Sequence, residues 1–341
     1  MKFPRRLLVS VLSLLACSSV FGQSTDTLKV IHTSDCHLIF NLDEVDPAIT
    51  RARKFNHTDD DSLPAVSDHN DSLELFLTTI PRQVGANAVV VTGDLIEFFE
   101  AQTVHNTLVS GQVEQFRTVY DKSPVPVYLT LGNHCITTYT VREKDSTLAT
   151  SQRHAGKARA AWIRNIPCFY NGTYYEKVFS VGKTKYHFVF LDNGYESLGD
   201  GQKVDKTQCD WLSERMELAG NDPVVLLFHI YYAVGDMNGD GISFKERGPV
   251  NWPTAKECST GLLKIINEHK NIRALVVGHG HSDVYEKIRF PGGSDVYQIE
   301  TGSVYNGLNN WRMFRMTENS IIVSKVGGEG TALSIDLGFR Q

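Results

Sequence analysis

Five short motifs in this 341-residue sequence combine side chains that bind metals or transfer protons. They are rich in histidine and aspartate, and glycine stands beside these residues in three of the five. The motifs are Asp35-Cys36-His37, Gly93-Asp94, Gly132-Asn133-His134, the single residue His229, and Gly278-His279-Gly280-His281. Mixed imidazole and carboxylate ligands favour Fe, Mn or Zn over Ca, and imidazole also titrates near neutral pH. The residue types therefore indicate a metal centre with a histidine able to transfer a proton.

Each motif follows a run of apolar, often β-branched residues, which is typical of a strand buried on both faces. The runs are Leu28–Ile31, Ala88–Thr92, Val125–Leu131, Val224–Phe228 and Ala274–Val277. In open α/β sheets, ligand sites form at the carboxyl ends of the strands. Any one of these motifs could arise by chance, but all five at strand ends indicate a common site.

The rest of the chain alternates between strand and helix signals. Helical stretches fall between the strands at Asp205–Leu218 and Ser259–His269. Two pairs of runs joined by short polar links predict hairpins. The pairs are Tyr174–Val181 with Lys185–Leu191, and Arg312–Met316 with Ile321–Lys325. This order predicts an α/β protein with mixed sheets.

Together, the motifs resemble the calcineurin-like metallophosphoesterase superfamily over about residues 28–304. The family pattern is D-x-H, GD, GNH followed by an acid, a lone H, and GH-x-H. The resemblance implies two mixed β-sheets packed as a sandwich flanked by helices, a four-layer α/β/β/α fold, with a two-metal site at one edge. It also implies a hydrolase acting on phosphoric ester bonds, a phosphatase or phosphodiesterase whose substrate is a small phosphate monoester or diester.

The resemblance also implies a role for each motif residue. Asp35, His37 and His281 look like ligands of the first metal. Asn133, His229 and His279 look like ligands of the second, and Asp94 looks like the bridge between the two. His134 is similar to the family histidine that contacts the reacting phosphate and protonates the leaving group.

Elementary chemistry agrees with these roles. Two metals can clamp an in-line displacement at phosphorus, with one activating water while both polarise the phosphoryl oxygens. A carboxylate such as Asp94 has two oxygens and can bridge, whereas Asn133 offers an amide oxygen without added charge. Two dications would outweigh the charges of the two aspartates and leave a positive spot suited to a phosphate ester. The expected cofactors are two divalent or trivalent ions, with Fe, Mn or Zn favoured.

Cys135 departs from the family pattern, because it stands where the family usually has an acid. All direct ligands are present, so metal binding is expected to persist. The sequence does not show which group supports His134 in place of the usual acid. The alternative function is a metal-binding but catalytically silent receptor or scaffold of the same fold. The purple acid phosphatase branch of the family normally has a tyrosine three residues after the GD aspartate and no histidine in the first motif. This chain has Glu97 at the first of these positions and His37 at the second, which argues against membership of that branch. Cys36 and Cys135 are either two buried thiols or a disulfide.

Three other features have less specific interpretations. Residues 41–74 hold nine acids and are expected to form a polar surface insertion; the alternative is a flap that brings His57 or His69 near the substrate. Residues 236–241 resemble the opening of a calcium loop, but Arg247 occupies the position of its final acid, which favours an active-site loop. Four further residues either line the pocket or pack in the core: Asn193, Tyr231, Tyr232 and Tyr305.

The N-terminus predicts export. A basic start is followed by the apolar run Leu7–Ala16 and then by small residues, the pattern of a secretory signal, and the run is too short to span a membrane. Cleavage after Gly22 would leave residues 23–341 as a single metallophosphoesterase domain, periplasmic or extracellular. The alternative is a lipoprotein anchored at Cys17, since Leu14–Cys17 resembles a lipobox.

Net charge excludes a basic nucleic-acid binder. The whole chain has a formal charge of −5, and removing residues 1–22 takes away Lys2, Arg5 and Arg6 but no acid, which leaves −8. Polyanion binding draws on basic contacts, so a nuclease on long nucleic acid is disfavoured. The expected partner is a small phosphate ester, and the sequence carries no signal for the oligomeric state.

Overall fold

The computed structural model describes residues 26–40, 66–102, 108–141, 148–194, 204–232, 246–247, 253–304 and 307–338. Several predicted features therefore lie outside the described residues: the N-terminal signal with Cys17, most of the acidic stretch, the loop at 236–241, and Tyr305. Residues 66–74 of the acidic stretch form the first half of a helix, in which Leu73 is buried. No helix in the described part of the chain combines the length and apolar character needed to cross a membrane.

The first sheet contains six strands in the order β17-β16-β15-β1-β2-β5. Its strands are β1 (Leu28–Thr33), β2 (Ala88–Thr92), β5 (Val127–Thr130), β15 (Arg312–Met316), β16 (Ser320–Val323) and β17 (Leu333–Asp336). β1, β2 and β5 run parallel, with Val30 opposite Ala88 and Val89 opposite Val127. The late hairpin predicted from the sequence is confirmed, because β15 pairs antiparallel with β16 and also closes onto β1.

The second sheet contains seven strands in the order β11-β13-β14-β12-β10-β9-β8. Its strands are β8 (Tyr175–Val181), β9 (Thr184–Phe190), β10 (Val224–Ile230), β11 (Glu246–Arg247), β12 (Ile272–Gly278), β13 (Tyr285–Arg289) and β14 (Asp295–Glu300). β9, β10, β12 and β14 are parallel neighbours, and β8 forms the predicted hairpin with β9. The parallel strands of both sheets thus carry the motifs at their carboxyl ends.

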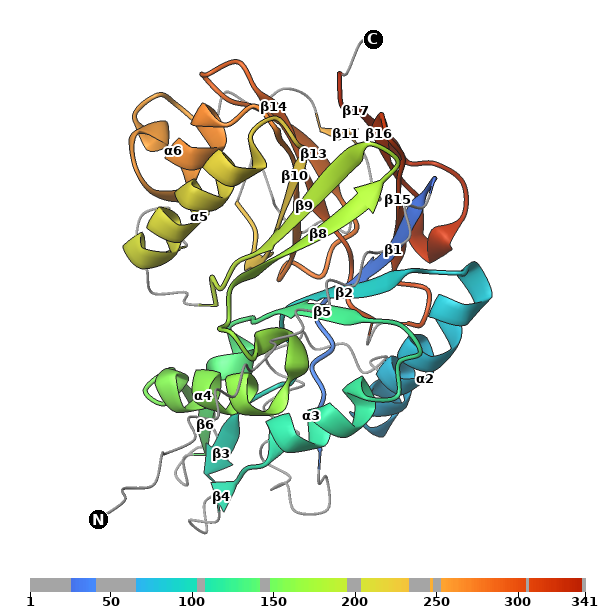
Figure 1. Ribbon diagram of the computed structural model, residues 1–341. Coiled ribbons are helices and arrows are strands. Elements are labelled where there is room, and N and C mark those ends of the chain that lie inside the picture. The colour runs from blue at the N-terminus through green and yellow to red at the C-terminus, as the bar shows by residue number, and fades with distance from the viewer. Residues whose placement is uncertain are drawn as a thin grey trace, which may run out of the picture.

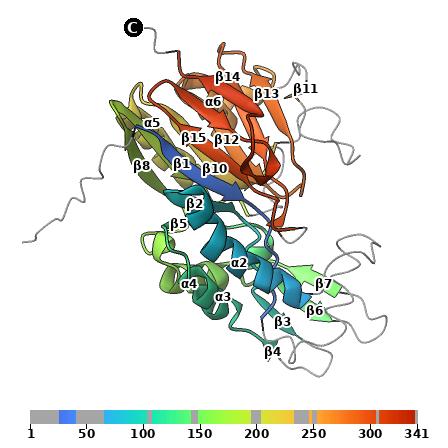
Figure 2. The same cartoon turned by 90° about the vertical axis from the view of Figure 1, so that its right-hand side faces the viewer.

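The two sheets pack face to face with helices on both outer sides (Figures 1 and 2). The helices are α2 (Val66–Val84), α3 (Gln112–Tyr120), α4 (Ala155–Asn165), α5 (Lys206–Ala219) and α6 (Gly261–Glu268). Successive side chains of a strand point to opposite faces. In β1, Val30 therefore packs against the second sheet, whereas Ile31 packs in the cluster that includes α2, α3 and α4. In β10, Leu227 faces the first sheet while Leu226 and Phe228 pack with α5 and α6. The predicted four-layer α/β/β/α fold is confirmed.

A third, small sheet was not predicted. It has the order β4-β3-β6-β7 and consists of β3 (Glu100–Gln102), β4 (Leu108–Val109), β6 (Thr138–Val141) and β7 (Leu148–Ser151). Its strands are only two to four residues long, and three of the four mix polar with apolar residues, so they lack the apolar runs that identify buried strands. β3 begins soon after the Gly93-Asp94 motif and β6 soon after Gly132-Asn133-His134, which places this sheet next to the motif loops.

Candidate metal centre

The motif loops have an unusual backbone. Among the described residues, five non-glycine residues have positive φ, and all five belong to the predicted motifs. They are Asp35 (52°), His37 (47°), Asp94 (41°), His279 (76°) and His281 (53°). This conformation is strained for residues with a Cβ and concentrates at functional sites. Backbone hydrogen bonds join two of the loops, from Asp35 N to Gly93 O (3.2 Å) and from His37 N to Asp94 O (2.8 Å).

A first group of ligand-type side chains consists of Asp35, His37 and His281. Their donor atoms all lie within 4.8 Å of one another. His281 Nε2 is 3.3 Å from Asp35 Oδ1 and 3.2 Å from His37 Nε2. The first two side chains are buried and the third is partly exposed, so the group lies at the edge of the sandwich. Three such atoms converging on one point fit a metal ion.

A second group consists of Asp94, His229 and His279, again with donor atoms within 4.8 Å of one another. His229 Nε2 lies 3.0 Å from Asp94 Oδ2. Asn133 joins this group, because its Oδ1 is 3.1 Å from His229 Nε2 and 3.1 Å from His279 Nδ1. The amide oxygen thus points to the same place as the two imidazoles.

Asp94 lies between the two groups. Its Oδ2 is 3.0 Å from His229 Nε2 in the second group and 3.8 Å from His37 Nε2 in the first. Its other oxygen, Oδ1, accepts a hydrogen bond from the backbone N of His134 at 2.8 Å, which fixes the carboxylate plane. All eight residues predicted for the site, including His134, therefore meet at one edge.

Outer hydrogen bonds orient the two innermost imidazoles. His37 Nδ1 is 2.8 Å from Glu97 Oε2, and His229 Nδ1 is 2.8 Å from the backbone O of Thr92. A carboxylate or a carbonyl oxygen accepts here, so Nδ1 carries the proton and Nε2 presents its lone pair to the group. This arrangement is typical of metal-ligating histidines. The donor set and its outer partners fit metal binding by imidazole, carboxylate and amide groups.

Electrostatics favours the charge states that bind cations at Asp35, His37 and His279, but not at His229. Burial lowers the pKa of His37 to about 3 and that of His279 to about 4, so both imidazoles are neutral at physiological pH. Burial by itself raises the pKa of Asp35, but the neighbouring His281 and His229 outweigh it and keep this pKa well below its ordinary value. At His229, burial is likewise outweighed, and the Asp94 carboxylate raises the pKa to about 9. A cation that binds His229 must therefore displace a proton.

His134 lies beside the first group. Its ring packs edge to face on His37 with 4.7 Å between centroids, and its side chain is 19% exposed. Nδ1 lies 2.8 Å from the backbone O of Glu97 and 3.1 Å from the Tyr139 hydroxyl. Burial lowers the pKa of His134, but the charges of Asp94 and Glu97 raise it by more, so the net shift is upward. The side chain can thus carry a proton at the rim of the site.

Comparison with known proteins decides the family. The calcineurin-like phosphoesterase family matches residues 28–283, which is most of the chain. The chain belongs to this family. It is therefore a metallophosphoesterase, a hydrolase of phosphoric ester bonds, as the motifs predicted.

Solved structures agree on the fold of this phosphoesterase. A dimetal phosphatase from Danio rerio is 13% identical, with a TM-score of 0.55 and alignment over 91% of this chain and 99% of that one. GAP50, the anchor in the inner membrane complex of Plasmodium, is 9% identical, with a TM-score of 0.50 over 93% and 90% of the two chains. No curated protein sequence matches this chain.

The glycines of the phosphoesterase motifs allow close approach of the ligands. A Cβ on Gly132 would overlap the Asp94 carboxylate, and one on Gly93 would overlap the His229 ring. A Cβ on Gly278 would lie 2.7 Å from Asp35 Oδ2. These distances are below ordinary van der Waals contact, so the glycines are required by the packing of the centre.

The residues predicted either to line the pocket or to pack in the core differ in where they lie. Asn193 is fully buried, and its Oδ1 accepts hydrogen bonds from the backbone N of His229 (2.9 Å) and of Ile230 (3.1 Å). Tyr232 is buried in the core with α5 and α6. Tyr231 is only partly buried, and its ring lies 5.9 Å from that of His279, next to the second group.

Sequence analysis missed the roles of Glu97 and Tyr139. Glu97 served only to exclude one branch of the family, although it stands three residues after Asp94 in the same loop. Tyr139 lies on the small sheet that was not predicted.

Cys36 and Cys135 are both buried free thiols, and Cys135 Sγ accepts a hydrogen bond from the backbone N of Leu95 at 3.3 Å.

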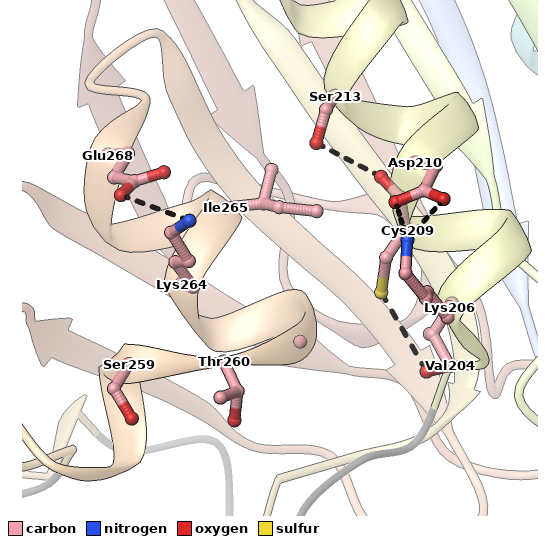
Figure 3. Close-up of a pocket in the computed structure, with 11 residues that line it drawn as sticks. Val204, Lys206, Cys209, Asp210, Ser213, Ser259, Thr260, Lys264, Ile265 and Glu268 are labelled. Atoms are coloured by element: carbon pink, nitrogen blue, oxygen red, sulfur yellow. Dashed lines mark hydrogen bonds and ion pairs between the residues drawn. The ribbon is translucent and has the colours of Figure 1, made fainter.

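A groove of about 430 Å³ lies between α5 and α6, and Figure 3 shows its lining. None of the eight predicted site residues lines it. Its two lysines are paired within their own helices: Lys206 Nζ is 2.6 Å from Asp210, and Lys264 Nζ is 3.8 Å from Glu268. Because acids balance these cations, the groove does not compete with the metal centre as a phosphate site.

Proposed function

We propose that the protein hydrolyses small phosphate esters at a centre of two metal ions. Asp35, His37 and His281 hold the first ion, Asn133, His229 and His279 hold the second, and Asp94 is shared. The observation that carries the proposal is the position of the Asp94 carboxylate, 3.8 Å from a nitrogen of one group and 3.0 Å from a nitrogen of the other. When bound, such a metal pair supplies polarisation of the phosphoryl oxygens and activation of a water nucleophile.

His134 is the proposed proton donor to the leaving group. Its Nδ1 is engaged by the carbonyl oxygen of Glu97, so Nε2 is the nitrogen that can donate to the departing oxygen. The upward shift of its pKa, produced by the charges of Asp94 and Glu97, keeps more of the protonated form near neutral pH. Partial exposure of the ring leaves it within reach of a bound ester.

Small diesters are the proposed preferred substrates. A phosphate monoester brings an additional charge, and its binding is helped by a basic clamp. Two arginines in the described part of the chain are paired with acids instead: Arg159 Nε is 2.6 Å from Asp192, and Arg312 is 3.2 Å from Asp283. The charge that attracts the ester would then come mainly from the metals, whose identity we propose to be Fe, Mn or Zn from the donor set.

The test is a paired assay of metal-loaded protein on bis(4-nitrophenyl) phosphate and 4-nitrophenyl phosphate. The wild type should hold two metals per chain and cleave the diester faster. Asp94→Asn should lose metal content and turnover together, by at least about 100-fold in turnover. The matched control is Asp210→Asn, an exposed aspartate of α5 that should behave like the wild type. Intact metal content and turnover in Asp94→Asn would disprove the two-metal proposal.

The alternative, a metal-binding scaffold without catalysis, is motivated by Cys135. The hydrogen bond from Leu95 N to Cys135 Sγ turns this side chain into the core beside α2, α3 and α4. It therefore contributes no group that blocks the centre. Protein that binds two metals and cleaves neither substrate at any pH would favour the alternative.

We further propose that the protein is exported, because residues 1–22 have the pattern of a secretory signal.

A further inference from the structure

Tyr139 connects the proposed proton donor to a buried carboxylate. It lies on β6 of the small sheet and is fully buried. Its hydroxyl donates a hydrogen bond to Glu97 Oε1 at 2.7 Å. The same hydroxyl oxygen is 3.1 Å from His134 Nδ1. Tyr139 therefore contacts both the imidazole that would move the proton and the carboxylate beside it.

The donors and acceptors in this cluster can be assigned from chemistry. The carbonyl oxygen of Glu97 lies 2.8 Å from His134 Nδ1 and can only accept, so Nδ1 carries a hydrogen. The Tyr139 hydroxyl donates its hydrogen to Glu97 Oε1. Its oxygen accepts from His134 Nδ1, whose hydrogen is thus shared between this oxygen and the Glu97 carbonyl in a bifurcated hydrogen bond. These roles satisfy all three contacts at once. They fix His134 in the tautomer that keeps hydrogen on Nδ1.

The backbone gives a second reason to look to Tyr139. His134 begins a short 3-10 helix, His134–Ile136, whose next residue is Cys135 rather than an acid. Cys135 turns into the core, where its Sγ accepts from Leu95 N at 3.3 Å, and it therefore takes no part in orienting the His134 ring. The Tyr139 hydroxyl does contact that ring, from a strand that starts four residues after His134 in the chain.

We propose that Tyr139 is the positioning residue of His134. It holds the ring with hydrogen on Nδ1 and Nε2 toward the ester, so that the proton leaves from Nε2. The proton passes from the His134 imidazolium to the leaving oxygen as the P–O bond breaks, and the ring is left neutral with its Nδ1 hydrogen in place. This role rests on the proposed function, because it requires His134 to protonate a leaving group.

The test uses the dependence of rate on the leaving group. Tyr139→Phe removes the hydroxyl and keeps the ring, so the variant should hold the same metal content as the wild type. A misaligned proton donor should slow the release of 4-nitrophenolate very little, because this group leaves without a proton. It should slow the release of an alkoxide strongly, because an alkoxide must be protonated as it leaves. We expect a loss below about threefold on a bis(4-nitrophenyl) diester and of about 10–100-fold on a methyl 4-nitrobenzyl diester that must expel an alkoxide, since general acid catalysis contributes about 10²–10⁴-fold.

Three further variants make the result specific. His134→Asn should show a larger loss with the same substrate dependence, and adding Tyr139→Phe to it should change the rates by less than about twofold, because the two residues act as one unit. Tyr186→Phe is the matched control. Its buried hydroxyl donates to Thr317 O at 2.6 Å, far along the chain from the motifs, and should leave the substrate dependence unchanged.

The outcomes separate the inference from the function on which it rests. If the wild type is active and His134→Asn shows the leaving-group effect, equal losses on both substrates in Tyr139→Phe, or no loss, would overturn the role of Tyr139 alone. If the metal-loaded wild type cleaves no substrate, the proposed function fails and the inference with it. A selective loss on the alkoxide ester in Tyr139→Phe, with no further loss when this change is added to His134→Asn, supports the proposal.

Discussion

The Glu97 carboxylate is hydrogen-bonded to His37, with 2.8 Å between Oε2 and Nδ1. Both side chains are buried. The bond leaves His37 Nε2 facing the cluster, 3.9 Å from Asp35 Oδ1 and 3.8 Å from Asp94 Oδ2. A carboxylate behind an imidazole fixes the ring and makes it a better metal ligand. Glu97 therefore belongs to the support of the first metal group, although it contributes no ligand in our assignment.

Glu97→Gln should weaken metal binding at the first group. An amide accepts a weaker hydrogen bond than a carboxylate and adds a donor that opposes the His37 Nδ1 hydrogen. Loss of such an outer partner typically lowers metal affinity by about 10–100-fold. Competitive titration with a chelator would measure this loss of affinity. One of the two ions should be lost at a lower chelator concentration than the other.

The matched control for this change is Glu176→Gln. Glu176 Oε1 lies 2.6 Å from His187 Nδ1 in the β8–β9 hairpin, a similar carboxylate–histidine pair away from the motifs. This variant should release metal like the wild type. Equal chelator resistance of Glu97→Gln and the wild type would show that the pair does not support the ligand.

The ligand cluster was predictable because its signals are local. Asp94 and His229 each follow a run of buried apolar residues, and such runs identify central parallel strands. The resemblance of the motifs to a known family then supplied the grouping of ligands. The strained backbone could not be read from the sequence, since Asp35 and His37 are ordinary residue types held at positive φ by their neighbours.

The support of the cluster was not predictable, because it comes from contacts between distant segments. Asn193 follows β9 in sequence and yet holds the backbone of His229 near the end of β10. Tyr139 reaches His134 from a strand of four residues, which is too short to give a strand signal. Such pairings depend on sheet order and loop geometry, which periodicity does not encode.

Asn193→Ala should destabilise the protein and loosen the second metal group. The Asn193 amide satisfies three backbone atoms, including a donated bond to Ile230 O at 2.8 Å. Each buried group left unsatisfied costs about 1–3 kcal/mol. Urea unfolding would measure the loss in free energy of unfolding, and metal analysis should show fewer than two ions per chain. Asn165→Ala on α4, whose side chain bonds partly exposed groups, is the control and should change stability by less than about 1 kcal/mol.

Gly132→Ala should damage the centre through one added methyl group. The new Cβ would lie 2.8 Å from Asp94 Cγ and closer still to Oδ1 and the backbone N. Overpacking of this kind costs about 1–3 kcal/mol, and here it also displaces the shared carboxylate. The control is Gly156→Ala in α4, where a Cβ meets nothing within 4 Å. It should be neutral or stabilise by up to about 1 kcal/mol. Equal thermal stability and metal content in the two variants would contradict this account.

His32 gives the sandwich a stability that depends on pH. It is buried between the sheets, with Nδ1 2.8 Å from Thr301 Oγ1 and Nε2 2.8 Å from Thr92 Oγ1. Burial, with a smaller contribution from the charge of Arg312, lowers its pKa from 6.5 to about 3. Between these two values the unfolded chain binds a proton that the folded protein does not. Stability is therefore present above pH 6.5 and is lost as the pH falls below it.

At about pH 5 this single residue should reduce the free energy of unfolding by about 2 kcal/mol relative to about pH 7.5, since the unfolded imidazole is then mostly protonated. Other buried histidines also titrate, and those with raised pKa values, such as His229, act in the opposite direction. The effect is therefore isolated by comparison with His32→Gln, which keeps polar atoms near both threonines and does not titrate. Urea unfolding of the two metal-free proteins at both pH values measures it. The wild type should lose about 2 kcal/mol more than the variant on acidification. Parallel losses would mean that His32 is protonated in the folded protein, and that burial between the sheets does not exclude its charge.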